Sequence, residues 1–426
     1  MIRIGDYWSY LQGEFGATLL PIVWNFIILL SIPTLTLILW VIFWPLWLTY
    51  VRSKNFFGIK YVILEVRLPR EMMKSPKAME LFLHSIHNTA DGNWIAQYIK
   101  GETRPWYSLE LVSIEGRVKF MIWSEDQRKI GLMSALYAQF PGIEIHEVED
   151  YTKGVQYDKE TMKLWAAEFK FTQDDPYPIK TYIDYGLDKD PKEEFKVDPL
   201  VPVLEFLGSV GPNQQVWIQF IVRAHKKEIR KPGTLFVKVD EWKEKAEELK
   251  NKIMMRDAKS KISGTKDKES GRTTPPTLSE GEKDIVAALD RSITKLPFDV
   301  GIRALYFGKK ESYVAPFGIG GIIGGMKNFN TEHLNGFKPN SDMWMGPLDL
   351  PWSDFRSIRK HRAARNALLA YKMRSFFYTP FTDGKQLVLN TEELATIYHF
   401  PGANAMTPTL DRIPSKKAGA PANLPI

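Results

Sequence analysis

The feature that most constrains this chain is an apolar run without one charged side chain between Ala17 and Val51. A helix needs roughly 20 apolar residues to cross the hydrocarbon core of a bilayer. The run exceeds that length but is short for two full spans with a turn. We therefore predict a single membrane-spanning helix over about Ile22–Leu48, in an anchor formed by residues 1–54. A re-entrant hairpin bent at Pro33 is the alternative, because proline interrupts helical hydrogen bonding.

The residues around this run favour a permanent anchor over a cleaved signal peptide. Acidic Asp6 and Glu14 precede it, whereas a signal peptide begins with basic residues and ends at small ones. Aromatic residues gather toward its ends, as in the interfacial belts of membrane spans: Trp24, Trp40, Trp44, Trp47 and Tyr50.

Flanking charge predicts the orientation of the span. Arg52, Lys54 and Lys60 follow the apolar run, and Arg3 is the one basic side chain before it. Because basic loops stay on the cytoplasmic side, we expect an external N-terminus and a cytoplasmic body attached to the inner membrane.

Composition limits the chemistry that this body can perform. The chain of 426 residues has no cysteine, which excludes disulfides, zinc–thiolate sites and a thiol nucleophile. Its formal net charge of +7 fits attraction to an anionic membrane surface, with nucleic acid as the alternative. The seven histidines form no ligand pattern; His84 and His87 share a helical face without an acidic partner at ligand spacing. We expect no cofactor, no metal and no enzymatic activity.

Residues 55–155 have the pattern of a ferredoxin-like β-α-β-β-α-β unit. The strands alternate apolar and polar residues, the helices repeat apolar residues at helical spacing, and Glu115-Gly116 is typical of a tight hairpin. The predicted elements are strand Lys60–Leu68, helix Pro76–Asn88, strands Trp106–Ile114 and Val118–Trp123, helix Gln127–Phe140 and strand Ile143–Val148.

A second ferredoxin-like unit is predicted over residues 160–310, so the expected fold class is α+β. Its predicted strands are Trp165–Phe171, Ile179–Tyr185, Val216–Ala224 and Val300–Phe307, and its helices Leu200–Val210 and Ile285–Thr294. A charged insertion, residues 226–283, interrupts it. Within that insertion Asp240–Lys261 has helical spacing, and Ser263–Glu282 is polar enough to form a flexible loop.

Residues 311–426 are predicted to form a helical C-terminal region with an extended tail. They include a glycine-rich stretch, GIGGIIGGMK at Gly318–Lys327. A phosphate-binding P-loop needs lysine directly after its last glycine, and Met326 stands there instead. A close-packed helix or hairpin is the better interpretation. Farther along, we predict a short strand over Gln386–Leu389 and a short helix over Asn390–Phe400, with Asn390 and Glu393 at the spacing of a capping box.

The densest cationic element is a helix expected over Trp352–Phe377. Its basic side chains are candidates for binding phosphate or an acidic partner, with an ordinary solvated face as the equal alternative. They are Arg356, Arg359, Lys360, Arg362, Arg365, Lys372 and Arg374.

The C-terminal segment carries a family resemblance. LVLNTEELATIYHFPG (Leu387–Gly402), followed by MTPTLDRIPSKKAGAPANLP (Met406–Pro425), resembles a stretch of conjugative type IV secretion and coupling-type ATPase proteins. In those chains a similar helix and strand lie just before the P-loop motor domain. The present sequence has no P-loop, so no ATP-binding residue carries over. Stand-alone proteins of unknown function from small-genome bacteria are also similar to it.

The resemblance implies a membrane-anchored accessory subunit that binds a hexameric P-loop ATPase in trans. DNA and further copies of the chain are other expected partners. The alternative is a module on the cytoplasmic face that binds nucleic acid or anionic lipid without a motor. The residues expected to dock the ATPase are Glu392, Glu393, His399, Phe400, Lys416 and Lys417.

Overall fold

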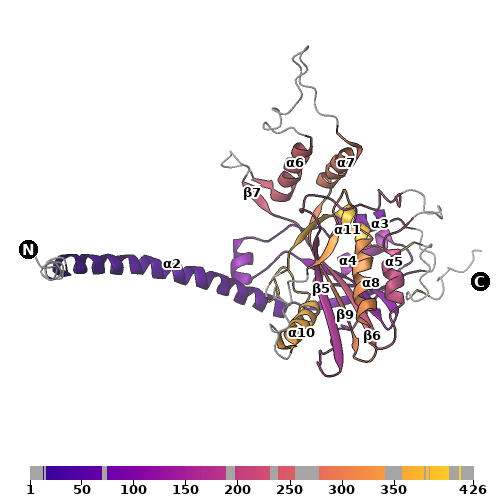
Figure 1. Ribbon diagram of the computed structural model, residues 1–426, viewed down its shortest axis with the longest axis horizontal. Helices are drawn as coiled ribbons and strands as arrows, with labels where there is room; N and C mark the ends of the chain where they lie inside the picture. Colours follow the sequence, from indigo (N-terminus) through magenta and orange to yellow (C-terminus); the bar gives the residue numbers. More distant parts are fainter. Residues whose placement is uncertain are drawn as a thin grey trace, which may run out of the picture. The chain divides into compact units, whose positions relative to one another are not determined.

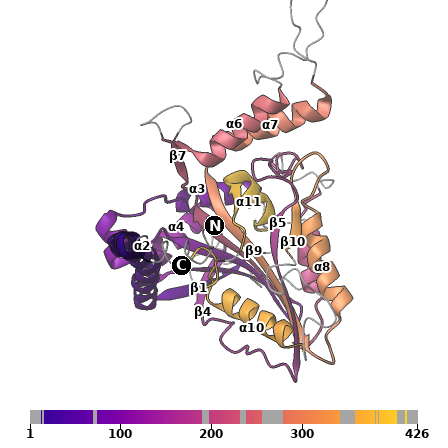
Figure 2. The same cartoon turned by 60° about the vertical axis from the view of Figure 1, so that its left-hand side comes forward.

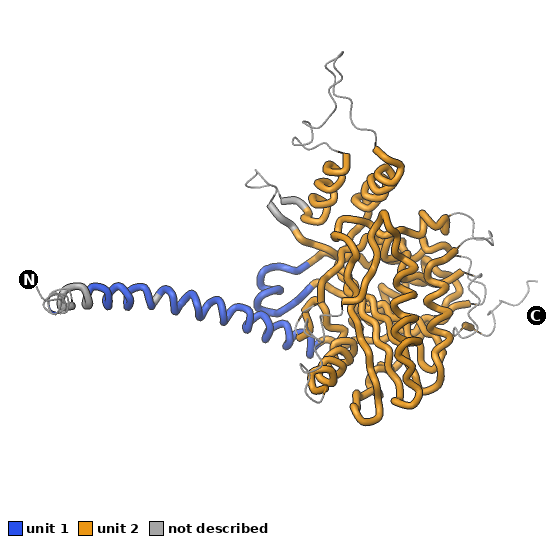
Figure 3. The backbone as a smooth tube through the Cα atoms, in the orientation of Figure 1, with its two compact units in different colours: residues 1–58, 91–103 blue, residues 59–90, 104–426 orange. Residues whose placement is uncertain are grey.

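The computed structural model describes residues 13, 16–69, 74–188, 197–230, 238–254, 278–340, 357–378, 380–382, 384–402 and 412–413. These residues form two units, each described separately below (Figure 3). The first consists of residues 1–58 and 91–103, and the second of residues 59–90 and 104–426.

The first unit is built on one long helix, α2 (Gly16–Gly58), drawn in indigo in Figure 1. Its residues Ile22–Gly58 are long and apolar enough to cross a membrane, so α2 is a candidate membrane-spanning helix. The helix continues through Pro33. The structure therefore shows one continuous helix here and not the re-entrant hairpin considered above. Residues 91–103 add a single π-helical turn, η2 (Ala96–Lys100).

The second unit begins with six elements at the predicted positions. They are β1 (Tyr61–Arg67), α3 (Lys77–Ile86), β2 (Trp106–Ile114), β3 (Arg117–Glu125), α4 (Lys129–Gln139) and β4 (Glu144–Val148). The predicted hairpin turn is confirmed, because Glu115 and Gly116 both have positive φ, 53° and 86°. The four strands pair antiparallel in the order β4-β1-β3-β2.

The next strands repeat this order. β5 (Met162–Phe171), α5 (Val201–Gly208), β6 (Gln214–Ala224), β9 (Pro297–Lys309), α8 (Ala315–Lys327) and β10 (Phe337–Asn340) give the antiparallel order β10-β5-β9-β6. This differs from the prediction in two ways. Residues 179–185 are not a strand, and the fourth strand is β10, which follows the glycine-rich helix α8 within residues 311–426.

The two sets of strands join in one sheet, because β2 pairs with β6 along its whole length. Glu110 lies opposite Gln219 at the middle of this pairing. The path of the sheet ends at β4 on one side and at β10 on the other. Residues 55–155 and 160–310 therefore share a single sheet.

One face of the sheet carries the main apolar core. Alternate strand residues such as Val216, Ile218 and Phe220 are buried there with Leu204 of α5 and Ile322 of α8. The glycines of α8 allow close packing: a Cβ on Gly318 would lie 2.1 Å from the Tyr306 ring. The glycine-rich stretch is thus a packed helix, as its sequence indicated.

The opposite face of the sheet is covered by α10 (Ile358–Lys372), whose Tyr371 ring lies 5.2 Å from that of Trp217 (Figure 2). Trp217 alternates along β6 with the core residues, which assigns it to this second face. The helix ends at Lys372 instead of the predicted Phe377, and residues 352–356 of the prediction lie outside the described residues.

The insertion between β6 and β9 contains a short hairpin and two helices. They are β7 (Glu228–Arg230), β8 (Lys238–Asp240), α6 (Glu241–Ile253) and α7 (Glu280–Thr294). Ser279 and Glu282 form a capping box at the start of α7, so the end of the predicted flexible loop is helical. Residues 263–277 of that loop lie outside the described residues, as do residues 255–261 at the end of the helix predicted over Asp240–Lys261.

The C-terminal elements pack back on the sheet. β11 (Leu387–Asn390) pairs antiparallel with the start of β9 and leads directly into α11 (Thr391–Ile397). Both elements were predicted, and the structure confirms them. Ile413 N donates a hydrogen bond to Leu68 O (2.9 Å).

Candidate functional site

The N-terminus of α11 is the centre of a buried polar cluster. The Asn390 side chain accepts a hydrogen bond from Glu393 N, and the Glu393 carboxylate accepts one from Asn390 N, both at 2.8 Å. This is the capping box that the sequence predicted. Because β11 ends at Asn390, the sheet itself fixes where α11 begins.

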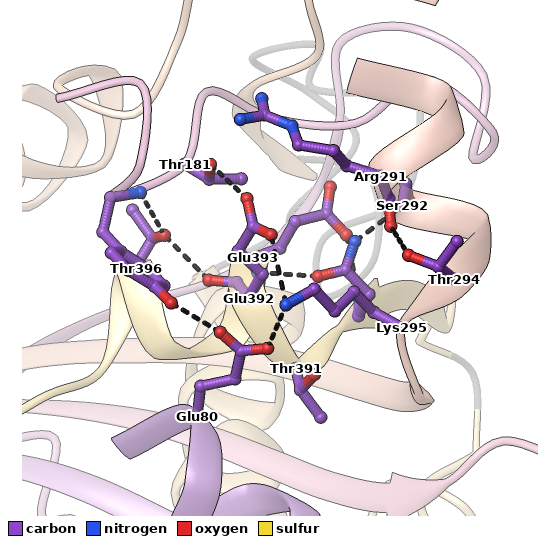
Figure 4. A network of polar contacts seen from close by, with 12 residues as sticks. Glu80, Thr181, Arg291, Ser292, Thr294, Lys295, Thr391, Glu392, Glu393 and Thr396 are labelled. Carbon is purple, nitrogen blue, oxygen red and sulfur yellow. Dashed lines mark hydrogen bonds and ion pairs between the residues drawn. The ribbon is translucent and has the colours of Figure 1, made fainter. Parts of the chain in front are cut away.

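We define the α11 carboxylate cluster as Glu80, Lys295, Glu392 and Glu393 (Figure 4). Lys295 Nζ lies 2.5 Å from Glu80 Oε1 and 3.6 Å from Glu392 Oε2, so one cation is shared by two carboxylates. Hydroxyl groups donate to the remaining oxygens: Thr181 to Glu392 and Tyr182 to Glu80, both at 2.5 Å. The cluster ties α3, residues 179–182, the end of α7 and α11 together.

Glu393 is the member of the cluster without a cation. Its second carboxylate oxygen accepts a hydrogen bond from Ile179 N at 2.9 Å. Burial, reinforced by the charge of Glu392, raises the pKa of Glu393 to about 8 despite its two backbone donors.

The next two predicted docking residues are also buried in the domain. His399 Nε2 lies 3.0 Å from Asp198 Oδ2, and the charge of Asp198 outweighs burial and raises the pKa of His399. The Phe400 ring contacts those of Phe120 and Phe140 edge-to-face.

The predicted ATPase-docking residues are therefore not an exposed surface. Glu392, Glu393 and His399 are each 2% exposed and Phe400 is 1% exposed. Their side chains hold α11 in its own domain, and a partner has no access to them in this conformation. Lys416 and Lys417 lie outside the described residues.

The predicted cationic helix divides into an exposed and a buried part. Its exposed side chains are Arg359, Lys360, Arg362 and Arg365, all on α10. Lys372 is part-buried and donates a hydrogen bond to Val155 O (2.6 Å). Arg374 follows the helix, with a positive φ of 48° and 1% exposure. Arg356 lies outside the described residues.

Arg374 is held by two acidic residues on the second face of the sheet. It donates to Glu110 Oε1 at 3.0 Å and to Asp150 Oδ2 at 2.6 Å. Burial alone would lower the pKa of Arg374, but the charges of these two carboxylates raise it well above its usual range. The Tyr151 hydroxyl also donates to Glu110, at 2.7 Å.

Glu110 belongs to a line of polar residues that crosses the sheet, which we call the central polar row. Strand register places Glu110 of β2 opposite Gln219 of β6, Gln219 opposite Arg303 of β9, and Arg303 opposite Glu168 of β5. Arg303 is fully buried and donates to Glu168 Oε1 from two nitrogens, at 2.6 and 3.0 Å. Both donors share one carboxylate oxygen, so this is a charge-assisted pair and not the fork in which each nitrogen bonds a separate oxygen.

A second ionic group lies farther along the same strands. Arg223 of β6 donates to Asp299 of β9 at 2.7 and 3.1 Å, and His225 Nδ1 lies 2.5 Å from the other Asp299 oxygen. His225 also lies 3.6 Å from Asp240. Burial lowers the pKa of His225, but the hydrogen bonds and charges of these two acids outweigh it and raise the pKa to about 9.

The sequence reasoning missed the central polar row and the His225 group. The residues of the central polar row are charged or amide side chains inside largely apolar strands, as Glu110 is in WYSLELVSI of β2. That pattern was the available signal, because a charged residue on a covered strand face must be paired.

One comparison with known proteins identifies the family. A model of DUF8128, a domain of unknown function, matches residues 58–413. The chain belongs to the DUF8128 family. No curated protein matches it significantly.

The DUF8128 match contains both the central polar row and the α11 carboxylate cluster. Within the described part of the domain, no group of three or more His, Asp or Glu side chains is placed to hold a metal ion. A pocket of about 670 Å³ lies between residues 174–177, α6 and Lys385, and its lining contains no residue of the row or the cluster. The buried ionic groups of this domain thus connect its strands and helices to one another. The charged side chains on its surface include the basic residues of α10.

Proposed function

We propose that this chain is a membrane-anchored accessory subunit. In this proposal α2 crosses the cytoplasmic membrane once, with the N-terminus outside and the DUF8128 domain in the cytoplasm. The length and apolar character of α2 support the span, and the basic residues Arg52, Lys54 and Lys60 after it support the orientation.

The proposed domain consists of two ferredoxin-like units fused at the centre of one sheet. The repeated strand orders, β4-β1-β3-β2 and β10-β5-β9-β6, support this interpretation. A body of this kind, with one continuous sheet, is suited to hold a partner at a fixed position on the domain.

The proposed partner is a P-loop ATPase on another chain, in a machine similar to type IV secretion. The observation that carries this proposal is the segment Leu387–Gly402. It resembles the stretch that precedes the motor in coupling-type ATPases, and here it is fixed to the body by β11–β9 pairing and by the α11 carboxylate cluster. A motor held next to this segment would keep a fixed orientation to the sheet of the domain.

Affinity capture of the full-length chain from its native membrane tests the proposal. We expect a P-loop ATPase to be recovered with the full chain and lost when the chain is truncated after Pro401. The truncation leaves β11 and α11 in place and removes the Ile413–Leu68 hydrogen bond, so the body should keep its protease resistance. If no ATPase is recovered with the full chain, the proposal is refuted. If a folded truncated chain recovers the ATPase normally, the docking surface lies elsewhere on the chain.

The exposed basic side chains of α10 favour a second candidate function, the binding of a polyanion such as DNA. Arg362 and Arg365 project from α10 into solvent, and each phosphate contact adds about one to the slope of log affinity against log salt. The double variant Arg362→Glu/Arg365→Glu should reduce that slope by about 2 in DNA-retention experiments. Lys309→Glu, at the exposed end of β9, is the matched control. Retention unaffected by the double variant would exclude α10 as the DNA-binding element.

A further inference from the structure

Residues 91–103 form a small excursion between α3 and β2 that belongs to the same unit as α2 (Figure 3). The excursion folds as one helical turn, η2, preceded by Trp94 and Ile95. It is part of the link from α3 to β2, and it also contacts α2.

The excursion is fitted closely to α2. Trp47 Nε1 donates a hydrogen bond to Tyr98 O at 2.9 Å, and the Tyr98 ring lies 5.4 Å from that of Trp44. Gly101 has a φ of +73°, and a Cβ there would lie 2.4 Å from Val51 O, so only glycine permits this approach.

The contact lies where α2 is expected to leave the membrane. Along α2 it extends from Trp44 to Asn55, whose amide donates to Gly101 O at 3.2 Å. At 1.5 Å per residue this is about 16 Å of helix. The charge-free run ends at Val51, within that distance, and Arg52 is the first cation after it. The excursion therefore spans the level at which apolar helix surface gives way to charged surface.

Three large apolar side chains of the excursion face outward. Trp94 is 61% exposed, and Ile95 and Ile99 are each 52% exposed. Covering apolar surface of this kind is worth about 25 cal/mol per Å². Lys100 follows directly and is exposed, which gives the excursion the apolar-then-basic order of segments that lie at a membrane surface.

We infer that residues 91–103 are a second membrane attachment, in which Trp94, Ile95 and Ile99 enter the interfacial region of the bilayer that α2 crosses. The inference rests on the proposed span. The bilayer is the occupant of this apolar surface because the surface is continuous with α2 at the end of its apolar run. Tryptophan and tyrosine are enriched at that depth, and the excursion adds Trp94 and Tyr98 to Trp40, Trp44 and Trp47 of α2. Two attachments fix the depth and rotation of the anchor, which a lone helix leaves free.

Site-directed spin labelling of the full-length chain tests this inference, and the absence of cysteine makes single labels straightforward. Ile95→Cys and Ile99→Cys report on the excursion, in nanodiscs of phosphatidylethanolamine and phosphatidylglycerol. Leu30→Cys on α2 is the lipid reference. Ile130→Cys on α4 is the matched control, an isoleucine that is 78% exposed in the second unit. For each label we measure the collision rate with oxygen, which enters lipid, and with a nickel chelate, which is soluble in water.

We expect labels at 95 and 99 to collide with the nickel chelate several-fold less than the label at 130, and more with oxygen. If they match the label at 130 while the label at 30 is in lipid, the surface attachment is refuted and the span stands. If the label at 30 also matches the label at 130, the span and the attachment both fail. Labels at 95 and 99 shielded from both reagents would show that protein covers this surface, which also overturns the inference.

Discussion

Replacing Arg374 by methionine should destabilise the domain severely. The substitution keeps a long side chain but removes the cation that pairs with Glu110, which is fully buried. Leaving a buried charge without its partner costs about 3–5 kcal/mol. Glu110 retains hydrogen bonds from Ser108, Tyr151 and Gln219, so the lower end, about 3 kcal/mol, is expected. Asp150 adds little, because its side chain is 23% exposed and water can solvate it.

Urea unfolding of the full-length chain in detergent, followed by pulse proteolysis, measures this loss. Arg365→Met, an exposed site on α10, is the matched control and should change the free energy of unfolding by less than about 0.5 kcal/mol. The double variant Arg374→Met/Glu110→Gln should recover at least about 1 kcal/mol relative to the sum of the single variants. Equal effects of Arg374→Met and Arg365→Met, or strict additivity in the double variant, would refute the pairing argument.

Three further substitutions probe the other buried features, and a fourth, at the exposed Gly320, is a control. The pKa of His225 is raised from 6.5 to about 9 in the folded state, so its contribution to the free energy of unfolding is complete below pH 6.5 and is lost as pH rises through 9. Urea titrations at pH 6 and pH 9 should show a loss of about 3 kcal/mol in the parent chain, and His225→Gln should abolish most of that difference. Lys295→Met removes the cation that Glu80 and Glu392 share, so hydrogen exchange of the α11 amides should accelerate. Unchanged protection of these amides would contradict the role given to the α11 carboxylate cluster. Gly301→Ala would place a Cβ 2.6 Å from the Phe376 ring and should lower stability by about 1–3 kcal/mol. Gly320→Ala, at a site on α8 with open space around it, should raise stability by about 0.5–1 kcal/mol. If both glycine variants changed the free energy of unfolding in the same direction, the packing argument would be disproved.

Local signals in the sequence were sufficient to predict most of the elements. Three of these signals depend on neighbouring residues alone. They are the alternation in the strands before residue 150, the Glu115-Gly116 turn and the Asn390–Glu393 capping box. The strand expected at 179–185 was wrong because its apolar residues are buried by tertiary contacts. Ile179 N and Tyr182 N donate to side chains of α11 instead of to a strand.

The candidate site was less predictable because its contacts join distant parts of the chain. Arg374 and Glu110 are 264 residues apart, and no local pattern distinguishes this arginine from its exposed neighbours on α10. Glu392 and Glu393 were predicted to dock an ATPase from the start of a short helix. Their burial depends on Lys295, Thr181 and Ile179, which only the fold brings to them.

The ends of the sheet determine how copies of this chain can associate. β4 has five residues, three of them Glu144, His146 and Glu147, and β10 has four, one of them Pro339. Short, charged or proline-containing edge strands are poor templates for pairing with another sheet. Neighbouring copies of the chain are therefore protected at β4 and β10 from joining strand to strand into fibres.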